Sequence, residues 1–285
     1  MRYCFSGHES FHCRSLWLKK GYDFLVNGHA FNAPDAVVHL GVGKNMVAAI
    51  RFWLKAFGLT ENDELTPLAH HIFSDDNGCD RFLEDTNTLW LLHYSLIGSN
   101  IASLYRLLFL EFQRERKEFD RQSLHSFVKR KCSVPEQKNV YNENTVKKDI
   151  NVLLQNYVSP ETLKSLEEFS ALMISLNLIL PSKDGIEKDR YYFNEIKSTS
   201  IARQIILYSI IDIKGKDNTV SFDKLKELSL IYCMPLPELI EAIKAIASTD
   251  KYGIHYTDNS GIKNVQFTKQ MDKFEALTDY YDLSR

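Results

Sequence analysis

The sequence lacks the features of an exported or disulfide-stabilised protein. Its five cysteines are an odd number and none of them forms a C-x-x-C pair, so we expect no disulfide framework and a reducing cytoplasm as the compartment. The N-terminus is polar within a few residues, which argues against a signal peptide. No apolar run approaches the length of a membrane span. The net charge of −2 argues against a general polyanion binder.

A nucleotide-binding loop is also missing, although one segment resembles it. Residues 40–46 read LGVGKNM, whereas a phosphate-binding loop requires G-x-x-x-x-G-K-[ST]. The first glycine of that pattern would fall on Val38, and the residue after Lys44 is Asn45, which has no hydroxyl to hold magnesium. We therefore interpret the segment as the turn between two helices.

The residues around this turn predict a helix-turn-helix. Asp35 is placed to cap a short helix over Ala36–Leu40, and Gly41 ends that helix because glycine readily adopts the left-handed conformation. A second helix is predicted from about Lys44 to Phe57. Its apolar residues recur at helical spacing toward a core and are Met46, Val47, Ile50, Trp53, Leu54 and Phe57. Its opposite face carries Lys44, Asn45, Ala48, Arg51, Phe52 and Lys55.

This cationic, amide-bearing face is typical of a recognition helix, which contacts phosphates and base edges in the DNA major groove. It is equally typical of the solvated side of an ordinary core helix. Residues 1–60 carry seven Lys and Arg against three Asp and Glu, a net charge of +4, and residues 116–148 carry nine against four, a net charge of +5. Two basic blocks separated by an acidic stretch indicate local footprints on nucleic acid.

The chain divides into three predicted modules. Residues 1–115 hold an N-terminal arm, a first winged-helix module and a helical extension, with short wing strands expected at Leu65–Leu68 and His70–Phe73. Residues 116–158 form a second helix-turn-helix-like module, and residues 159–285 form a C-terminal winged-helix-like domain. The fold class expected is mainly α with small β wings, as tandem winged-helix or helix-turn-helix modules. The alternative is a generic helical protein with no nucleic-acid role.

The second module repeats the geometry of the first. Asp120 is placed to cap one helix, and Asn142 or Asn144 starts another. The inward residues of that second helix are Val146, Ile150, Leu153, Leu154 and Tyr157. Its outward residues, which we predict to contact DNA, are Thr145, Lys147, Lys148 and Asn151.

The third module is predicted to begin with a helix start at Ser159–Glu161. A strand at Tyr191–Phe193, an apolar helix, a helix pair at Phe222–Leu230 and Leu236–Ala247, and a hairpin around the turn at residues 258–261 follow. The second helix of the pair exposes Glu238 and Glu241, which would repel phosphates. We therefore expect this module to serve folding or protein contact.

The N-terminal arm, Phe5–Arg14, concentrates reactive side chains, and three interpretations are open. Cys4, His8 and His12, with Cys13 or Glu9, could hold zinc, but Ser6 and Gly7 disfavour the continuous helix that this spacing needs, so no metal site is predicted. His8 and Glu9 could act as an acid–base pair while Arg14 holds a phosphate. The favoured interpretation is structural, with the arm packing its Phe residues against the first module.

A metal-dependent nuclease would need carboxylates that hold magnesium beside the scissile phosphate. The restriction-like fragment in the chain is Glu195-Ile196-Lys197, with Asp184 or Asp189 upstream. An isolated E-x-K is common by chance, and this one leads into an apolar helix. It is therefore a weak candidate.

Several segments together resemble one bacterial family of formerly unknown function. They are FSGHESF, LWLKKGYD, LGVGKNM, IRFWLKAFGL, LTPLAHHIF, FLEDTNTLWLLHY and NENTVKKDINVLLQNYV, and the resemblance covers about residues 1–215. Such proteins are encoded beside cysteine desulfurases and PAPS-reductase-like sulfur-transfer enzymes, in loci that install phosphorothioate in DNA and act in phage defence. Members of SspB type are described as DNA-nicking components. A non-histidine is usual at position 12 in this family, which argues against His12 as a ligand.

The resemblance implies a DNA-binding component of a phosphorothioate DNA-modification and defence system, with nicking of duplex DNA as its candidate activity. A non-catalytic DNA-binding adaptor and a transcription regulator are the alternatives. The implied partners are double-stranded DNA and the sulfur-transfer and desulfurase proteins of the locus, and the implied cofactor of a nickase is Mg²⁺ or Mn²⁺. No catalytic residue is carried over from the family, so His8, Glu9 and Arg14 remain the catalytic candidates.

Overall fold

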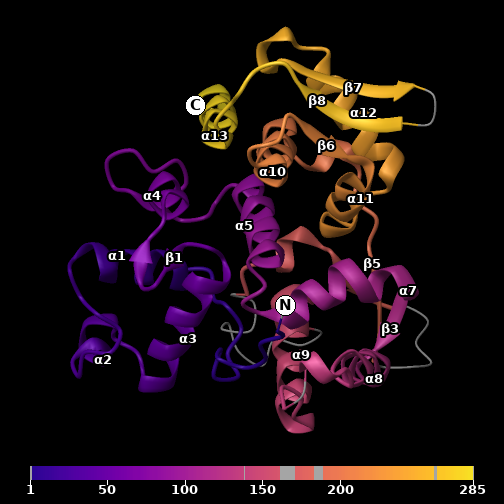
Figure 1. Cartoon of the computed structure of the whole chain (residues 1–285). Coiled ribbons are helices and arrows are strands. Elements are labelled where there is room, and N and C mark those ends of the chain that lie inside the picture. The colour runs from indigo at the N-terminus through magenta and orange to yellow at the C-terminus, as the bar shows by residue number, and fades with distance from the viewer. Residues whose placement is uncertain (1, 138, 161–170, 183–188, 260–261, 285) are drawn as a thin grey trace. The chain divides into compact units, whose positions relative to one another are not determined.

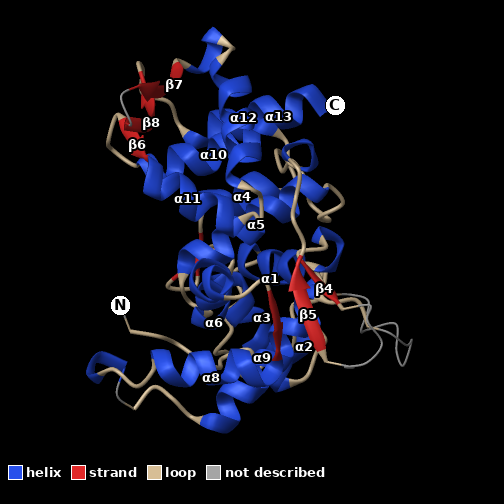
Figure 2. Cartoon of the chain, turned by 90° about the vertical axis from the view of Figure 1, so that its right-hand side faces the viewer, coloured by secondary structure: helices blue, strands red, loops and turns tan. Residues whose placement is uncertain are grey.

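The computed structural model describes residues 2–137, 139–160, 171–182, 189–259 and 262–284. Its contacts divide the chain into two units, Met1–Asn194 and Glu195–Arg285. Each unit is mainly helical with small antiparallel sheets, as the sequence predicted (Figures 1 and 2). None of the helices in these ranges is long and apolar enough to cross a membrane. The finer boundaries at 115/116 and 158/159 stay a prediction, and the predicted helix start at Ser159–Glu161 runs beyond the described residues.

The first unit begins with a group of short helices and one hairpin. Its elements are α1 (Trp17–Val26), α2 (Ala36–Leu40), α3 (Lys44–Ala56), β1 (Thr60–Glu61), β2 (Glu64–Leu65) and α4 (Pro67–Phe73). Helix α3 packs against α1 and α2. The approach to α1 is close because α1 has a glycine there: a Cβ on Gly21 would lie 2.6 Å from Leu54 Cδ1 of α3.

The two helices predicted on either side of the Gly41 turn are present as α2 and α3. Gly41 ends α2 in the left-handed conformation, with φ of 61°. The Asp35 side chain does not cap α2 and instead lies 3.2 Å from His39. The inward stripe of α3 is buried, except that Met46 is only half-buried.

The predicted wing strands were wrong in position. The hairpin is formed by β1 and β2, directly after α3, and His70–Phe73 belongs to helix α4. Local chemistry explains this: Thr66 accepts the Ala69 N–H at the start of α4, and Pro67 occupies its first turn. The apolar residues that looked like a strand bury one face of that short helix.

The rest of the first unit surrounds a three-stranded antiparallel sheet of order β3-β5-β4. Its elements are α5 (Thr86–Ser99), α6 (Ser103–Arg106), the π-helix η1 (Leu107–Phe112), α7 (Gln113–Glu115), β3 (Glu118–Asp120), α8 (Arg121–Lys131), η2 (Pro135–Gln137), α9 (Glu143–Tyr157), η4 (Ile174–Leu176), β4 (Ile179–Pro181) and β5 (Arg190–Phe193). Phe119 of β3 pairs with Tyr191 of β5. Asp120 caps α8 as predicted, and Asn142, one of the two predicted candidates, caps α9. These two helices pack together.

The second unit follows the predicted order of a helix, a helix pair and a hairpin. Its elements are η5 (Ser198–Ser200), α10 (Arg203–Lys214), β6 (Thr219–Ser221), α11 (Phe222–Ile231), α12 (Leu236–Ala247), η6 (Asp250–Tyr252), β7 (Ile254–Asn259), β8 (Ile262–Phe267) and α13 (Lys273–Ser284). Strand β6 pairs with β8, which also pairs with β7. Residues 260–261 of the predicted turn lie outside the described ranges.

Candidate nucleic-acid interface

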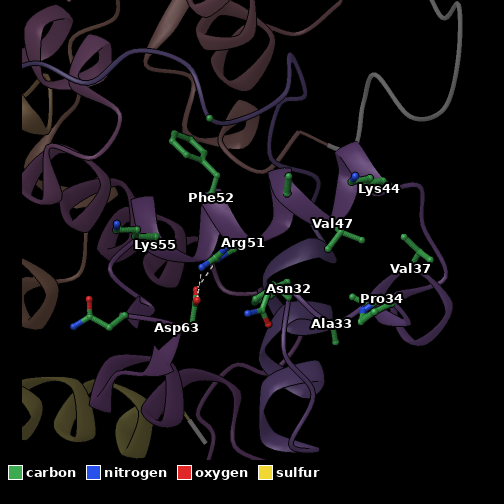
Figure 3. Close-up of a pocket in the computed structure, with 15 residues that line it drawn as sticks. Asn32, Ala33, Pro34, Val37, Lys44, Val47, Arg51, Phe52, Lys55 and Asp63 are labelled. Atoms are coloured by element: carbon green, nitrogen blue, oxygen red, sulfur yellow. Dashed lines mark hydrogen bonds and ion pairs between the residues drawn. The ribbon is translucent and has the colours of Figure 1, made fainter.

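A hollow of about 1120 Å³ lies over the solvent face of α3. Helix α3 contributes Lys44, Val47, Ala48, Arg51, Phe52 and Lys55. The segment between α1 and α3, from Phe31 to Val37, and the β1–β2 turn, Asn62–Asp63, supply further lining, together with Gly7 of the N-terminal arm. In Figure 3, Phe52 extends on one side of α3, whereas Asp63 and Asn32 lie on the other.

The α3 cations differ in how they are paired. Lys44 and Lys55 are exposed, and neither forms an ion pair with any residue in the described ranges. Arg51 makes a bidentate pair with Asp63: its Nε donates to Oδ1 at 2.8 Å and its Nη2 to Oδ2 at 2.5 Å. These hydrogen bonds raise the pKa of Arg51, so the guanidinium stays charged. Three of the four predicted DNA contacts on α3 therefore line one hollow, and Asn45 is exposed beside it.

The turn that presents Asp63 explains why Arg51 is held in an ion pair. Asn62 and Asp63 have φ of 51° and 66°, the left-handed conformation that a two-residue hairpin turn requires. The turn follows α3 directly, so the Asp63 carboxylate meets the guanidinium. Sequence reasoning missed Asp63 because the hairpin was expected later in the chain. The pair N-D at a tight turn was the available signal.

The arm lies against α3 through Phe52 and Trp53. A Cβ on Gly7 would lie 2.6 Å from Phe52 Cδ2, so only glycine fits there without a shift. The His8 ring is edge-on to Phe52, with centroids 5.7 Å apart, and stacked with Trp53 at 6.1 Å. The Trp53 indole N–H donates to Phe11 O at 3.1 Å. These contacts support the favoured interpretation, in which the arm packs against the first module.

The arm is also joined to α9. Asp149 accepts from the Ser6 N–H at 2.8 Å through Oδ2, and its Oδ1 lies 3.0 Å from His8 Nε2. The Ser10 N–H donates to His8 Nδ1 at 3.1 Å, so Nε2 carries the ring proton and donates to Asp149. The His8 and Asp149 side chains are 5% and 7% exposed. A buried pair thereby links the arm to the helix that holds the second set of predicted DNA contacts.

The outward face of α9 is less open than predicted. Lys147 pairs with Glu143 at 2.5 Å, and Asn151 Oδ1 accepts from Arg121 Nε at 3.2 Å. Thr145 is half-buried, and its N–H donates to Asn142. Lys148 is exposed and, among the residues the structure describes, has no ion-pair partner. A pocket of about 250 Å³ brings Lys147 and Asn151 together with residues of α8, which are Arg121, Gln122 and His125.

The catalytic candidates do not form the acid–base pair that the sequence suggested. His8 is buried and paired with Asp149, whereas Glu9 is exposed and has a φ of 48°. Arg14 is half-buried, with its guanidinium 5.2 Å from the centroid of Trp17. Sequence reasoning missed Asp149, although an acid on the inward stripe of an amphipathic helix was a signal of a buried partner.

The described residues do not make a metal site. Within the ranges given above, no group of three or more His, Cys, Asp and Glu side chains is arranged to hold an ion, so the zinc arrangement considered for the arm is not formed there. Burial raises the pKa of Cys13 well above its usual value. Of the restriction-like fragment, Glu195 and Lys197 are exposed, and Asp184 lies outside the described residues.

Comparison with known proteins gives a family and a fold. A family described as "Protein of unknown function (DUF4007)" matches residues 5–281. Two solved structures share the fold, the SspB crystal structure with a TM-score of 0.83 and the magnesium ion-bound SspB crystal structure with a TM-score of 0.81. Each is 24% identical, and each match covers 99% of this chain and 89% of the other. No curated protein matches the chain. The resemblance to SspB-type proteins is thus confirmed at the level of the fold.

Proposed function

The chain belongs to the DUF4007 family, and from that premise we propose that it is the DNA-binding component of a phosphorothioate DNA-modification and defence system. The observation that carries the proposal is the hollow over α3, where Lys44 and Lys55 stand exposed beside Arg51. When a lysine without a carboxylate partner binds a DNA phosphate, it displaces counterions condensed on the DNA. The release of these ions drives association with nucleic acid. The SspB fold supports the phosphorothioation context.

Within this proposal the first unit carries the DNA contacts. Helices α2 and α3 with the β1–β2 hairpin serve as a short winged helix, in which Lys44, Asn45, Arg51 and Lys55 contact the backbone. Thr145, Lys147, Lys148 and Asn151 on α9 supply a second, weaker contact, because Lys147 and Asn151 already have protein partners.

The second unit serves protein contact in this proposal. Its order of helix, strand, two helices and hairpin, with β6 on β8, supports a winged-helix assignment. The helix in the recognition position, α12, exposes Glu241, and Glu238 accepts from the Ser198 N–H and hydroxyl. Carboxylates there disfavour phosphate. The partners proposed are the sulfur-transfer and cysteine desulfurase proteins of the same locus, in the reducing cytoplasm where the five free cysteines are stable.

Binding is tested by fluorescence anisotropy with duplex DNA over a range of salt concentrations. The Lys44→Ala, Lys55→Ala double variant should lose affinity, and its slope of log K against log salt should fall by about one unit per lysine. Lys216→Ala is the matched control, since Lys216 is exposed in the second unit. An unchanged slope in the double variant would reject α3 as the DNA-contacting helix.

Nicking is the candidate activity of this component, with Mg²⁺ or Mn²⁺ as the cofactor. A supercoiled plasmid should become open-circular with either metal and stay supercoiled in EDTA. Glu9→Gln tests the exposed candidate and Arg14→Gln the half-buried one. The thermal stability of His8→Ala is measured as well, because His8 is buried with Asp149 and its loss can destabilise the fold. Binding without nicking under either metal would reject the nickase.

A non-catalytic adaptor is the second candidate. One observation favours it: the His8 side chain, the strongest acid–base candidate, has both ring nitrogens engaged, one by Asp149 and the other by the Ser10 N–H. A histidine held in this way serves to orient the arm. The plasmid assay separates the two candidates.

A further inference from the structure

We propose that the hollow over α3 binds an unpaired stretch of a DNA strand, with a base stacked on Phe52. This inference rests on the proposed DNA-binding function and names the form of DNA that this site takes. Phe52 is half-buried and lines the hollow with Lys44, Arg51 and Lys55. Its ring extends from α3 on the side opposite Asp63 (Figure 3). An aromatic ring beside cations is the composition of single-strand sites, where bases stack on aromatic rings while the backbone follows the charge.

The lining of the hollow favours unpaired DNA over an intact duplex. The faces of duplex bases are covered by their neighbours, so a protein aromatic can stack only on a base that has left the helix. The apolar residues Phe31, Val47 and Ala48 also line the hollow and would meet only phosphates and sugars on a duplex surface. A base that enters the hollow instead meets an apolar floor.

The number of available cations points the same way. A duplex-binding protein commonly contacts about 6–10 phosphates. The hollow offers Lys44 and Lys55 without ion-pair partners in the described ranges, while Arg51 is held by Asp63. Two free lysines are few for a duplex track, whereas stacking one base adds about five- to more than one-hundredfold in affinity.

The size of the hollow fits a short run of nucleotides. Pockets for a single small molecule measure roughly 300–1,000 Å³, and this hollow, at about 1120 Å³, exceeds that range. Its amides, Asn32 and Asn62, provide hydrogen-bonding groups for base edges. The arm holds the stacking ring in place, because Gly7 and His8 pack against it.

The test compares three labelled DNAs of one sequence: an intact duplex, the same duplex with a short central gap, and the isolated strand. We expect the gapped duplex and the isolated strand to bind more tightly than the intact duplex. Phe52→Leu should weaken binding to gapped DNA by about five- to one-hundredfold and change binding to the intact duplex little. Phe52→Tyr should retain the preference. Phe82→Leu is the matched control, because Phe82 is 54% exposed and does not line the hollow.

A second measurement reports stacking directly and needs no variant. A 2-aminopurine base placed in the gap should lose fluorescence on binding to the wild-type protein, as it does when it stacks. An intact duplex that binds as tightly as the gapped one, or an unquenched 2-aminopurine in bound DNA, would overturn the inference while leaving the proposed function standing. Failure of all three DNAs to bind at low salt would overturn both.

Discussion

His8 Nε2 lies 3.0 Å from Asp149 Oδ1, and this contact joins residues 141 positions apart in the sequence. The same carboxylate accepts the Ser6 N–H, and the Trp53 ring stacks on the His8 imidazole. The pair is buried, so each partner would lose its hydrogen bond without gaining water if the other were removed. It therefore anchors the arm between α3 and α9.

Removal of either partner should destabilise the protein. His8→Ala and Asp149→Ala should each lower the free energy of unfolding by about 2–4 kcal/mol, because each leaves a buried polar group unsatisfied. The double variant should cost less than the sum, with a coupling of about 1–3 kcal/mol in denaturant titrations. Glu9→Ala, at an exposed neighbour, is the control and should change stability by less than about 0.5 kcal/mol. Additive losses would show that the two residues act independently.

Asp63 should restrain DNA binding by competing for Arg51. Asp63→Asn removes the carboxylate of the bidentate pair and leaves the guanidinium free to meet a phosphate. We expect tighter DNA binding and a salt slope that steepens by about one unit. Glu61→Gln removes the same charge from the same hairpin without touching Arg51, so it is the matched control. An equal gain in both variants would mean that only the net charge of the hairpin matters.

Asp120 should contribute a pH-dependent part of the stability of α8. The hydrogen bond from the Ser123 backbone N–H lowers the pKa of Asp120 below its usual value of 3.8. Because the unfolded chain then binds the proton more readily than the folded one, the contribution is complete above that usual value and is lost as pH falls through the lowered pKa. Asp120→Ala should cost about 1 kcal/mol at neutral pH. Asp120→Asn keeps a cap but loses the pH dependence, and parallel acid-denaturation curves for it and the wild type would contradict this role.

Gly7→Ala should displace the arm from α3. Gly7 has a φ of 102°, and an added Cβ would lie 2.6 Å from the Phe52 ring, so we expect a loss of about 1–3 kcal/mol. Gly98 near the end of α5 has open space around it, and Gly98→Ala should instead stabilise by about 0.5–1 kcal/mol. Thermal unfolding measures the stability of both variants relative to the wild type. A Gly7→Ala protein as stable as the wild type would place the arm elsewhere.

The elements that depend on local signals were predictable. The turn at Gly41, the inward stripe of α3, the cap at Asp120 and the bounds of α12 all follow from residues within one or two helical turns of each other. One exception is α4, whose buried residues fall in two adjacent pairs, Leu68–Ala69 and Ile72–Phe73, and so short an apolar segment suits either a strand or a helix. The helical conformation is favoured by Thr66, which caps α4, and by Pro67 in its first turn.

Residue patterns along the chain suffice for the helical class, the outward cations of α3 and the family to which the chain belongs. The tertiary structure decides which of those cations are free, because Arg51 meets Asp63 across the β1–β2 turn, a contact that the periodicity of α3 does not encode. It also decided that His8 faces Asp149 and not Glu9, since a contact between residues 141 positions apart depends on how the arm crosses α3 and α9. Periodicity specifies which face of a helix is outward, and packing specifies what that face meets.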